Sequence, residues 1–558
     1  MKVSSFDIFD TCLVRRCGTP ENFLNILSLR AFNHEPQEWA RQEFVAARRL
    51  TEQKLWQENP NYTLHDIWVE FDWSHQFLKP KKELCQLELE LEREMLVPVL
   101  SMRDKVNECR KRGDKIIFVS DMYLSSEFLI DILRNYGFYQ EGDALYVSCE
   151  CGVLKMNGEL FEYVRKQENL SSFRNWHHYG DNKQGDYNAP KKLGIKCTLI
   201  NHAYTPYQQQ WVDNDYSLGF KYPSILAGLG RALHYSTEWN AHTDFVLDII
   251  APFYCSLVYR MMKDAELCGI KRLYFCARDA YMMFLIAQKY QHLFPEIELS
   301  FLYISREALY KGNDKAKIAY YQSIRLATKT DYVGIVDIRS SGRTLVYLNK
   351  YLVEKGFKSV RGYYFELFCG AADIQQDYYP SDYYLELSDR YDVEKAHMIG
   401  SVSHVFETFF PLNTLSKTRN YEITAEGLKP VFELLEEDTS EQMYVKDKAQ
   451  WASIHEQLIL LFTNAYIQNG LYRYSNEIFK KANQTLFGFI KEPKKEYLSA
   501  LLCLYGKRWD SQFLPYIRHE SWIKLLLTRG NDSWWKQGTI IFNDFHWFQK
   551  LYQKLRYE

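Results

Sequence analysis

Short apolar runs alternate with helical segments in two separate stretches of the chain, and this alternation restricts the folds that the chain can adopt. The first stretch has five such runs, at residues 3–9, 115–119, 146–148, 177–179 and 197–200. Parallel strands need long crossover connections, and helices usually provide them. The alternation therefore predicts a parallel sheet covered by helices, an α/β domain over residues 1–205.

A long helical segment interrupts this first domain. Residues 20–112 are almost entirely helical in pattern, with apolar side chains at helical spacing from Glu38 to Gln57 and from Lys81 to Leu100. Gly113 ends the last helix before the strand pattern resumes. The sequence thus predicts a helical block inserted between the first and second strands of the sheet.

The second stretch repeats the α/β pattern. Its apolar runs lie at residues 273–276, 299–304, 332–337 and 360–365. Helical patterns lie between them, and a looser segment at 203–216 precedes them. We predict a second α/β domain over residues 206–420, followed by a mostly helical C-terminal region over 421–558.

Charge and composition exclude several classes of protein. The chain has 69 Lys and Arg against 71 Asp and Glu, a net charge of -2, so we expect no nucleic-acid partner. Twelve cysteines in 558 residues are too few for a disulfide scaffold. The most apolar segment, Phe245–Met262, is interrupted by Asp248 and Pro252 and predicts a buried helix. With no signal segment at the N-terminus, we expect a cytoplasmic protein.

Polar side chains follow the strands of the first domain. They are Asp7, Ser120, Asp121, Ser148 and Asp181, with Lys155 and Asp186 just beyond two of the strands. In doubly wound sheets, ligands bind at the carboxyl ends of the strands, so these groups should converge. Carboxylates bind Mg²⁺, and hydroxyl and ammonium groups neutralise phosphate oxygens. The sequence therefore predicts a site for Mg²⁺ and phosphate.

These residues fall in four ordered motifs that resemble those of the haloacid dehalogenase (HAD) superfamily, which consists mostly of phosphatases. The motifs are Asp7-Ile8-Phe9-Asp10-Thr11, Val119-Ser120-Asp121, Lys155 and Gly180-Asp181-Asn182 with Asp186. The resemblance implies a Rossmann-like domain. It also implies that the helical block, at about residues 17–100, is a cap that closes over the substrate and excludes water.

The resemblance also implies roles for individual residues. Asp7 would be the nucleophile that forms an aspartyl-phosphate, while Ser120 and Lys155 would hold the transferred phosphoryl group. Four residues would hold the Mg²⁺ ion: Asp7, the backbone carbonyl of Phe9, Asp181 and Asp186. These assignments make the first domain a phosphoric monoester hydrolase.

One position departs from the phosphatase pattern. Phosphatases of the superfamily carry a second Asp two residues after the nucleophile, as general acid and base, and this chain has Phe9 there. The adjacent Asp10 is the candidate replacement, provided that the chain turns after the strand. Dehalogenases of the superfamily also lack this acid, but they need no metal, whereas the pair Asp181 and Asp186 fits a magnesium site.

A second candidate site lies in the second α/β stretch. The strand ending at Asp337 runs into a Ser/Gly loop before a helix, where N–H groups and hydroxyls would bind phosphate and Asp337 would bind ribose hydroxyls. This segment resembles the phosphoribosyltransferase signature, although Val336 replaces the first acid of its acidic pair. Arginines after two earlier strands would bind pyrophosphate. The predicted site for phosphoribosyl pyrophosphate (PRPP) comprises Arg278, Asp279, Arg306, Asp337, Ser340, Ser341, Gly342, Arg343 and Thr344.

The two domains together resemble bifunctional enzymes that build ribofuranose into bacterial O-antigen and capsule polysaccharides. One domain would transfer 5-phosphoribosyl from PRPP to a glycan acceptor, with a lipid-linked glycan as one option, and the other would remove the 5-phosphate. Two alternatives stay open at this point. The chain would be a stand-alone Mg²⁺-dependent phosphatase acting on a sugar phosphate, or a non-catalytic assembly protein.

Three smaller features complete the sequence interpretation. Glu407 is a candidate base for the acceptor hydroxyl, and a buried structural role is the alternative. The basic, amphipathic segment 547–557 would contact an anionic membrane surface, with a solvated terminal helix as the alternative. His177 and His178 precede the fourth motif on a strand, and we interpret them as packing residues.

Overall fold

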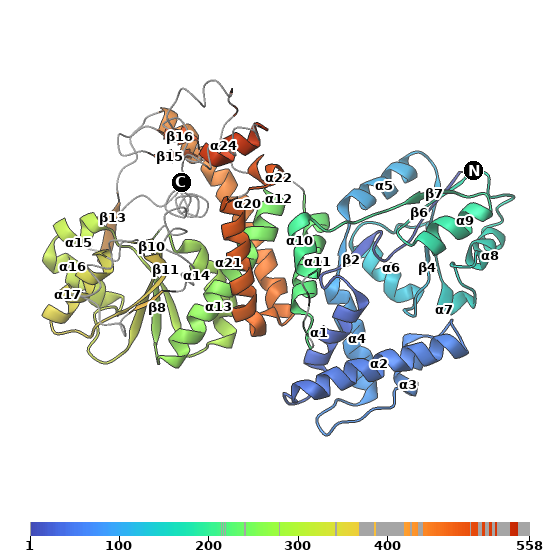
Figure 1. Ribbon diagram of the computed structural model, residues 1–558, viewed down its shortest axis with the longest axis horizontal. Coiled ribbons are helices and arrows are strands. Elements are labelled where there is room, and N and C mark those ends of the chain that lie inside the picture. The colour runs from blue at the N-terminus through green and yellow to red at the C-terminus, as the bar shows by residue number, and fades with distance from the viewer. Residues whose placement is uncertain are drawn as a thin grey trace, which may run out of the picture. The chain divides into compact units, whose positions relative to one another are not determined.

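The computed structural model divides the chain into two compact units. Unit 1 contains Met1–Trp239 and Gln468–Leu471, and unit 2 contains Asn240–Ile467 and Tyr472–Glu558. Figure 1 labels their helices and strands. The structure describes residues 2–213, 215, 217, 219–238, 242–277, 279–340, 343–367, 384–386, 418–424, 427–432, 439–491, 493–499, 505–507, 513–515, 519, 521 and 536–544.

Unit 1 is built on a five-stranded parallel sheet with the strand order β5-β4-β1-β6-β7. The strands are β1 (Val3–Phe6), β4 (Lys115–Ser120), β5 (Ala144–Val147), β6 (Trp176–Gly180) and β7 (Lys196–Leu199). All four residues of the central strand β1 are buried, as expected when helices cover both faces of a sheet. This is the Rossmann-like order, so the predicted α/β fold of the first stretch is confirmed.

Helices connect these strands and cover the sheet (Figure 1). They are α5 (Leu100–Lys111), α6 (Ser126–Asn135), α7 (Ser148–Cys151), α8 (Glu159–Gln167), the π-helical turn η1 (Lys183–Asn188) and α9 (Ala189–Lys192). The buried side chains of α8 are Leu160, Phe161 and Val164, which share one face and pack against Ile117 and Trp176 of the sheet. This apolar layer fixes the sheet from which the polar strand ends project.

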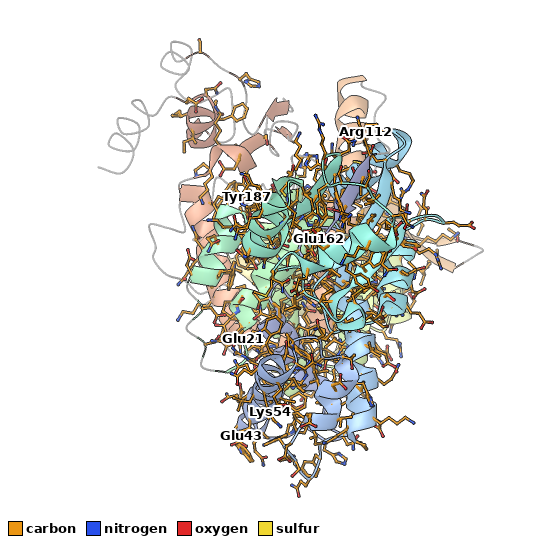
Figure 2. All side chains as sticks on the ribbon, turned by 90° about the vertical axis from the view of Figure 1, so that its right-hand side faces the viewer. Glu21, Glu43, Lys54, Arg112, Glu162 and Tyr187 are labelled. Atoms are coloured by element: carbon orange, nitrogen blue, oxygen red, sulfur yellow. The ribbon has the colours of Figure 1, made fainter. Side chains whose placement is uncertain are left out.

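The helical block lies between β2 (Leu13–Arg15) and β3 (Leu96–Pro98), which pair antiparallel. Its helices are α1 (Pro20–Arg30), α2 (Glu38–Glu58), α3 (Leu64–Glu70) and α4 (Lys81–Met95). Figure 2 shows Glu21 and Lys54 of this block in the lower part of the view, and Glu162 and Tyr187 higher up, beside the sheet. The predicted helical insertion is therefore present, as a lobe distinct from the sheet.

A buried ion pair lies at the base of this block. Arg15 Nη2 of β2 is 2.6 Å from Glu92 Oε1 of α4, and both side chains are almost completely buried. The Arg15 guanidinium also lies 4.7 Å from the ring centroid of Phe9. Breaking such a buried pair leaves an uncompensated charge, so this contact constrains how the block joins the sheet.

Two further helices, α10 (Pro206–Asp213) and α11 (Tyr222–Ser236), belong to unit 1. The sequence pattern predicted them as part of the second domain. Helix α11 packs against β2 and β3, and the contact is close because Gly228 has no side chain. A Cβ there would lie 2.3 Å from the backbone nitrogen of Gly18 and 2.4 Å from the carbonyl carbon of Cys17. This close approach brings α11 next to the motif that follows β1.

Unit 2 contains a second five-stranded parallel sheet, with the order β12-β11-β10-β8-β9. The strands are β8 (Arg272–Cys276), β9 (Glu298–Leu302), β10 (Val333–Ser340), β11 (Arg361–Leu367) and β12 (Tyr384–Glu386). Counted along the chain this is the order 2-1-3-4-5, the other common doubly wound arrangement. The predicted alternation of strands and helices in the second stretch is confirmed.

The helices of unit 2 include the predicted apolar segment. They are α12 (Thr243–Phe245), η2 (Val246–Ile250), α13 (Ala251–Leu267), α14 (Tyr281–Tyr290), η3 (Gln291–Leu293), α15 (Arg306–Lys311), α16 (Asp314–Ser323), α17 (Arg343–Glu354), α20 (Thr439–Gln468), η5 (Leu471–Tyr474), α21 (Ser475–Lys491), α22 (Lys495–Leu498) and α24 (Lys536–Phe542), except that the last residue of α20 and the first residue of η5 are assigned to unit 1. Among the described residues, one helical run, Thr243–Leu267, is long and apolar enough to cross a membrane. Of its most apolar stretch 89% is buried inside the protein, as predicted for a core helix.

The C-terminal region over 421–558 contains short strands as well as helices, and the sequence pattern predicted only the helices. The described residues there form two antiparallel strand pairs, β13 (Thr418–Thr424) with β14 (Gly427–Phe432) and β15 (Tyr505–Lys507) with β16 (Phe513–Pro515). The first hairpin is held by tertiary packing. Tyr421 is buried, donates its O–H to the carbonyl of Tyr303 over 2.7 Å and stacks on Tyr320.

Candidate active site

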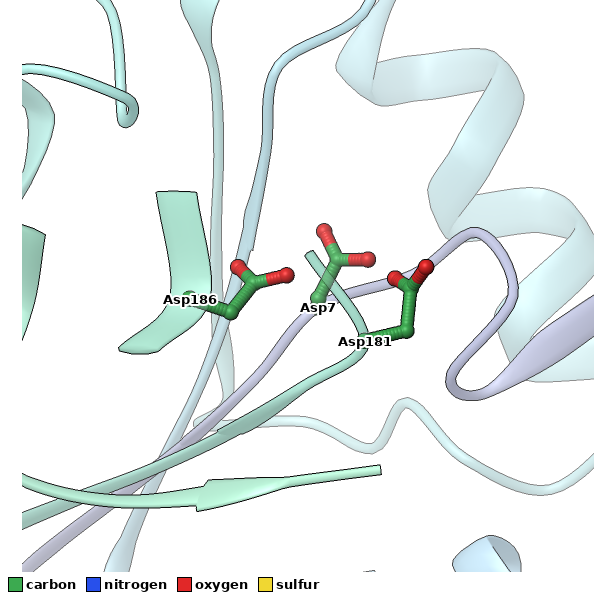
Figure 3. A group of neighbouring side chains, drawn as sticks. All are labelled: Asp7, Asp181 and Asp186. Carbon is green, nitrogen blue, oxygen red and sulfur yellow. The ribbon is translucent and has the colours of Figure 1, made fainter. Parts of the chain in front are cut away.

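The strand order of unit 1 brings its acidic motifs together. In the order 3-2-1-4-5 the topological switch point lies between the first and fourth strands, here β1 and β6. Asp7 directly follows β1 and Asp181 directly follows β6, so both carboxylates lie at this point. Asp186 joins them from η1, and Figure 3 shows the three side chains gathered together. One carboxylate oxygen from each lies within 4.8 Å of the others.

Asp186 is held from several sides. Its Oδ2 accepts a hydrogen bond from the backbone N–H of Asn182 over 2.8 Å, and its Oδ1 lies 2.6 Å from Lys155 Nζ. His178 Nε2 lies 3.0 Å from the same Oδ1. Gly180 leaves space for it, because a Cβ there would lie 2.3 Å from Asp186 Cγ. The side chain is completely buried, and these contacts fix its orientation.

Lys155 links two of the three carboxylates. Its buried ammonium group contacts Asp7 Oδ1 as well as Asp186 Oδ1, and it donates to the carbonyl of Val119 over 3.3 Å. The loop that carries it is anchored by Asp121, which accepts hydrogen bonds from the backbone N–H groups of Lys155 and Met156 over 2.7 and 3.1 Å. Asp121 therefore positions Lys155 by holding the backbone of its loop.

The electrostatics differ among the acids. Burial raises the pKa of Asp7 well above its usual range, against the opposing charge of Lys155. Burial and the charges of Asp10 and Asp186 raise the pKa of Asp181 to about 6. Burial would also raise the pKa of Asp186, but Lys155 and the His178 hydrogen bond hold it below its usual value. The cluster thus contains one firmly ionised acid and two that protonate easily.

The remaining predicted residues lie around this cluster. Ser120 is buried at the end of β4, and Phe9, Asp10 and Ser120 all line the same cavity as Asp7. Asp10 adopts a left-handed backbone conformation with φ of 48°, which supplies the turn that the sequence interpretation required. Its Oδ1 accepts a hydrogen bond from Arg231 Nη2 over 2.8 Å. The structure thus brings the predicted HAD-type residues of unit 1 to one place.

Sequence reasoning missed two contributors. His178, interpreted as a packing residue, is buried but also contacts Asp186, while its Nδ1 lies 2.7 Å from Ser5 Oγ. Burial lowers the pKa of His178, so the neutral ring donates to Asp186 and accepts from Ser5. Arg231, which holds Asp10, lies on α11, outside the predicted first domain. The alternation of side chains between the two faces of β6 is a weak signal that His178 belongs to the site. The sequence around Arg231 has no signal of this kind.

The donor set fits the predicted cofactor. Three carboxylates offer hard oxygen ligands, which Mg²⁺ prefers over nitrogen or sulfur. Asp7, Asp181 and Asp186 are therefore the residues that would hold the ion. The predicted contribution of the Phe9 carbonyl stays a prediction.

The site lies in a cavity of about 840 Å³ within unit 1. Beyond the acids, the cavity is lined by residues of the helical block, among them Glu21 of α1 and Arg49, Gln53 and Trp56 of α2. This volume is towards the upper end of the range for ligand pockets, about 300–1,000 Å³. The cavity therefore has room for a substrate considerably larger than phosphate.

The second predicted site lies at the switch point of the unit 2 sheet, between β8 and β10. Asp279 follows β8, Asp337 lies in β10, and Cys276 at the end of β8 is close to both. Burial raises the pKa of the Cys276 thiol, and the carboxylates of Asp337 and Asp279 raise it further.

The other residues of the second predicted site are only partly described. By backbone position, Ser340 ends β10, Arg343 and Thr344 begin α17, and Arg306 begins α15. Four predicted features lie outside the described residues: Arg278, Ser341, Gly342 and Glu407. The C-terminal segment 547–557 also lies outside them.

Comparisons with known proteins gave matches to solved structures alone. No protein-family profile matches the chain, and no curated protein matches it. The putative HAD hydrolase YfnB from Bacillus subtilis, solved with magnesium, is 18% identical, with a TM-score of 0.27; the match covers 37% of this chain and 89% of that one. A 2-haloacid dehalogenase from Pseudomonas syringae is 13% identical, with a TM-score of 0.27, and the match covers 36% of this chain and 87% of that one. A putative beta-phosphoglucomutase from Thermotoga maritima is 14% identical, with a TM-score of 0.28, and the match covers 37% of this chain and 88% of that one.

The raised pKa of Asp181 makes a prediction about Mg²⁺ binding. Protons compete with the cation for Asp7 and Asp181, so Mg²⁺ affinity should rise as the pH increases through about 6, with protons released on binding. Calorimetry in two buffers of different ionisation enthalpy measures both quantities. Asp181→Asn should weaken binding about tenfold or more and flatten this pH dependence.

The control for this experiment is Asp131→Asn. Asp131 is an exposed acid on α6, and its replacement should leave Mg²⁺ affinity unchanged. Binding that is independent of pH in the wild type, or equal weakening by both variants, would contradict the assignment of the acidic cluster as the cation site.

Proposed function

We propose that unit 1 hydrolyses phosphate monoesters in a Mg²⁺-dependent reaction through a covalent intermediate on Asp7. The observation that carries this proposal is the buried cluster of Asp7, Asp181, Asp186 and Lys155 at one end of a large cavity. A carboxylate beside a cation site and an ammonium group is suited to attack a phosphate, because both positive charges stabilise the transferring phosphoryl group.

The first step transfers the phosphoryl group to the protein. Asp7 attacks phosphorus through a carboxylate oxygen, a bond forms between them, and the bond from phosphorus to the ester oxygen breaks. Lys155 and Ser120 hold the phosphoryl oxygens during this transfer. Bound Mg²⁺ supplies positive charge that offsets the phosphate charge and the carboxylate charges.

Asp10 is the proton donor and acceptor in this proposal. It gives a proton to the departing ester oxygen and then takes one from the water that attacks phosphorus, which releases inorganic phosphate and restores Asp7. Two features support this assignment: Asp10 lines the cavity with Asp7, and Arg231 fixes its carboxylate. Its left-handed backbone conformation is of the kind that concentrates at functional sites.

For unit 2 we propose PRPP-dependent transfer of a 5-phosphoribosyl group to a glycan hydroxyl. A bond forms between the anomeric carbon and the acceptor oxygen, pyrophosphate leaves, and the acceptor proton passes to a base. The supporting observation is the position of Asp279 and Asp337 near Cys276, at the switch point where doubly wound sheets bind ligands. Unit 1 would then remove the 5-phosphate and leave ribofuranose in a bacterial glycan.

Asp7→Asn tests the nucleophile. We expect this variant to lose phosphate release from p-nitrophenyl phosphate and from sugar phosphates by about 10³-fold or more, because the amide cannot form the covalent intermediate. Phosphate release is measured with Mg²⁺ at neutral pH, and circular dichroism verifies the fold. Activity close to that of the wild type would remove Asp7 from this role.

Asp10→Asn tests the proton donor through the leaving group. Asn tolerates the left-handed conformation, so the fold should be retained. We expect kcat/KM, which covers only the steps up to formation of the covalent intermediate, to fall about 10²- to 10³-fold for a sugar phosphate, whose alkoxide leaving group needs a proton. For p-nitrophenyl phosphate, whose leaving group needs none, the loss should be much smaller. Equal losses on both substrates would assign Asp10 a different role.

Asp337→Ala tests the second site. We expect calorimetry to show binding of PRPP with Mg²⁺ to the wild type, and affinity at least about tenfold lower in the variant, because hydrogen bonds to the ribose hydroxyls are lost. Lys289→Ala, an exposed position near the end of α14, is the matched control. No PRPP binding by the wild type would favour the alternative of a stand-alone phosphatase.

A further inference from the structure

The cavity that holds the acidic cluster continues onto one face of α2. Arg49, Gln53 and Trp56 line it at helical spacing, together with Glu52 and Gln57. Residues three or four positions apart lie on one side of a helix, so these five side chains form a continuous surface, the α2 wall. The acids line only part of the cavity, and the α2 wall therefore faces space beyond the acidic cluster.

Trp56 is an unusual residue for a helix surface. Its side chain is 44% exposed, although it is one of the largest apolar groups in unit 1. Gln53 and Gln57 lie on either side of it along the helix, and both are exposed. An aromatic face flanked by two amides offers a flat apolar contact together with hydrogen-bond donors and acceptors.

The charged groups of the α2 wall already have partners. Arg49 Nη1 lies 3.1 Å from Glu21 Oε1, and Glu52 Oε2 lies 2.9 Å from Arg48 Nη1. The Tyr62 hydroxyl donates to the other oxygen of Glu52 over 3.2 Å. A second anionic group of a substrate would have to compete with Glu21 for Arg49. The wall therefore favours an uncharged ligand over a second phosphate or a carboxylate.

A sugar ring matches these properties. Its C–H groups form an apolar face that stacks on an indole, and its hydroxyls project from the rim, where amide groups both donate and accept. We propose that the α2 wall is a subsite for an uncharged sugar residue linked to the phosphorylated group, so that unit 1 acts on a phosphorylated glycan of two or more sugars. This inference rests on the proposed phosphatase function of unit 1.

The experiment compares Trp56→Ala with Trp39→Ala. Trp39 lies on the same helix with 52% of its side chain exposed, but it does not line the cavity. The substrates are acetyl phosphate, glucose 6-phosphate, a panel of disaccharide monophosphates that includes trehalose 6-phosphate, and 5′-AMP. The measured quantity is kcat/KM for release of inorganic phosphate.

We expect the wild type to prefer a disaccharide phosphate over glucose 6-phosphate. Trp56→Ala should lower kcat/KM for that disaccharide phosphate about tenfold more than for acetyl phosphate, mainly through KM, and Trp56→Phe should recover part of the loss. Trp39→Ala should behave as the wild type. Three results would each overturn the inference: a kcat/KM that is no higher with a second sugar, a preference for 5′-AMP, or equal effects of Trp56→Ala and Trp39→Ala.

A binding measurement separates this inference from the proposed chemistry. Calorimetry with Asp7→Asn compares trehalose 6-phosphate and inorganic phosphate, with and without Trp56→Ala. Selective weakening of the disaccharide phosphate by about tenfold supports the subsite even if the wild type proves inactive as a phosphatase. Equal affinity for trehalose 6-phosphate with and without Trp56→Ala would overturn the proposed subsite, even if the wild type is an active phosphatase.

Discussion

The ammonium group of Lys155 makes the acidic cluster of unit 1 possible. Three carboxylates and one ammonium group carry a combined charge of -2 when all are ionised, inside a largely buried site. Lys155 offsets the repulsion between Asp7 and Asp186. Burial, together with the remaining negative charge, explains why Asp7 and Asp181 protonate easily. A divalent cation would restore neutrality, so the cluster is organised around a charge that the chain itself does not provide.

The same topological rule governs both sheets. The switch point of unit 1 lies between β1 and β6, and that of unit 2 lies between β8 and β10. Asp7 and Asp181 lie at the first of these points, and Asp279 and Asp337 lie at the second. The two sheets differ in what is built around them, since the helical insertion that follows β2 contributes to the cavity of unit 1.

The parts of the fold that depend on local pattern could be predicted from the sequence. Asp7 and Asp181 were identified because each follows a buried strand, and the chain order of those strands predicts where their ends meet. Arg231 could not be identified, because its contact with Asp10 depends on the close packing of α11 near Gly18. The β13–β14 hairpin was missed for a similar reason, since Tyr421 is stabilised by distant tyrosines.

The helical block leaves the sheet through β2 and returns through β3, and these two strands are paired with each other. The two ends of the insertion are therefore adjacent in space. A short connection between β2 and β3 could join them if the helices were removed. An insertion of this kind is modular: evolution or design can exchange its helices while the sheet and its acidic cluster are kept. The ion pair of Arg15 and Glu92 is what such an exchange would have to preserve.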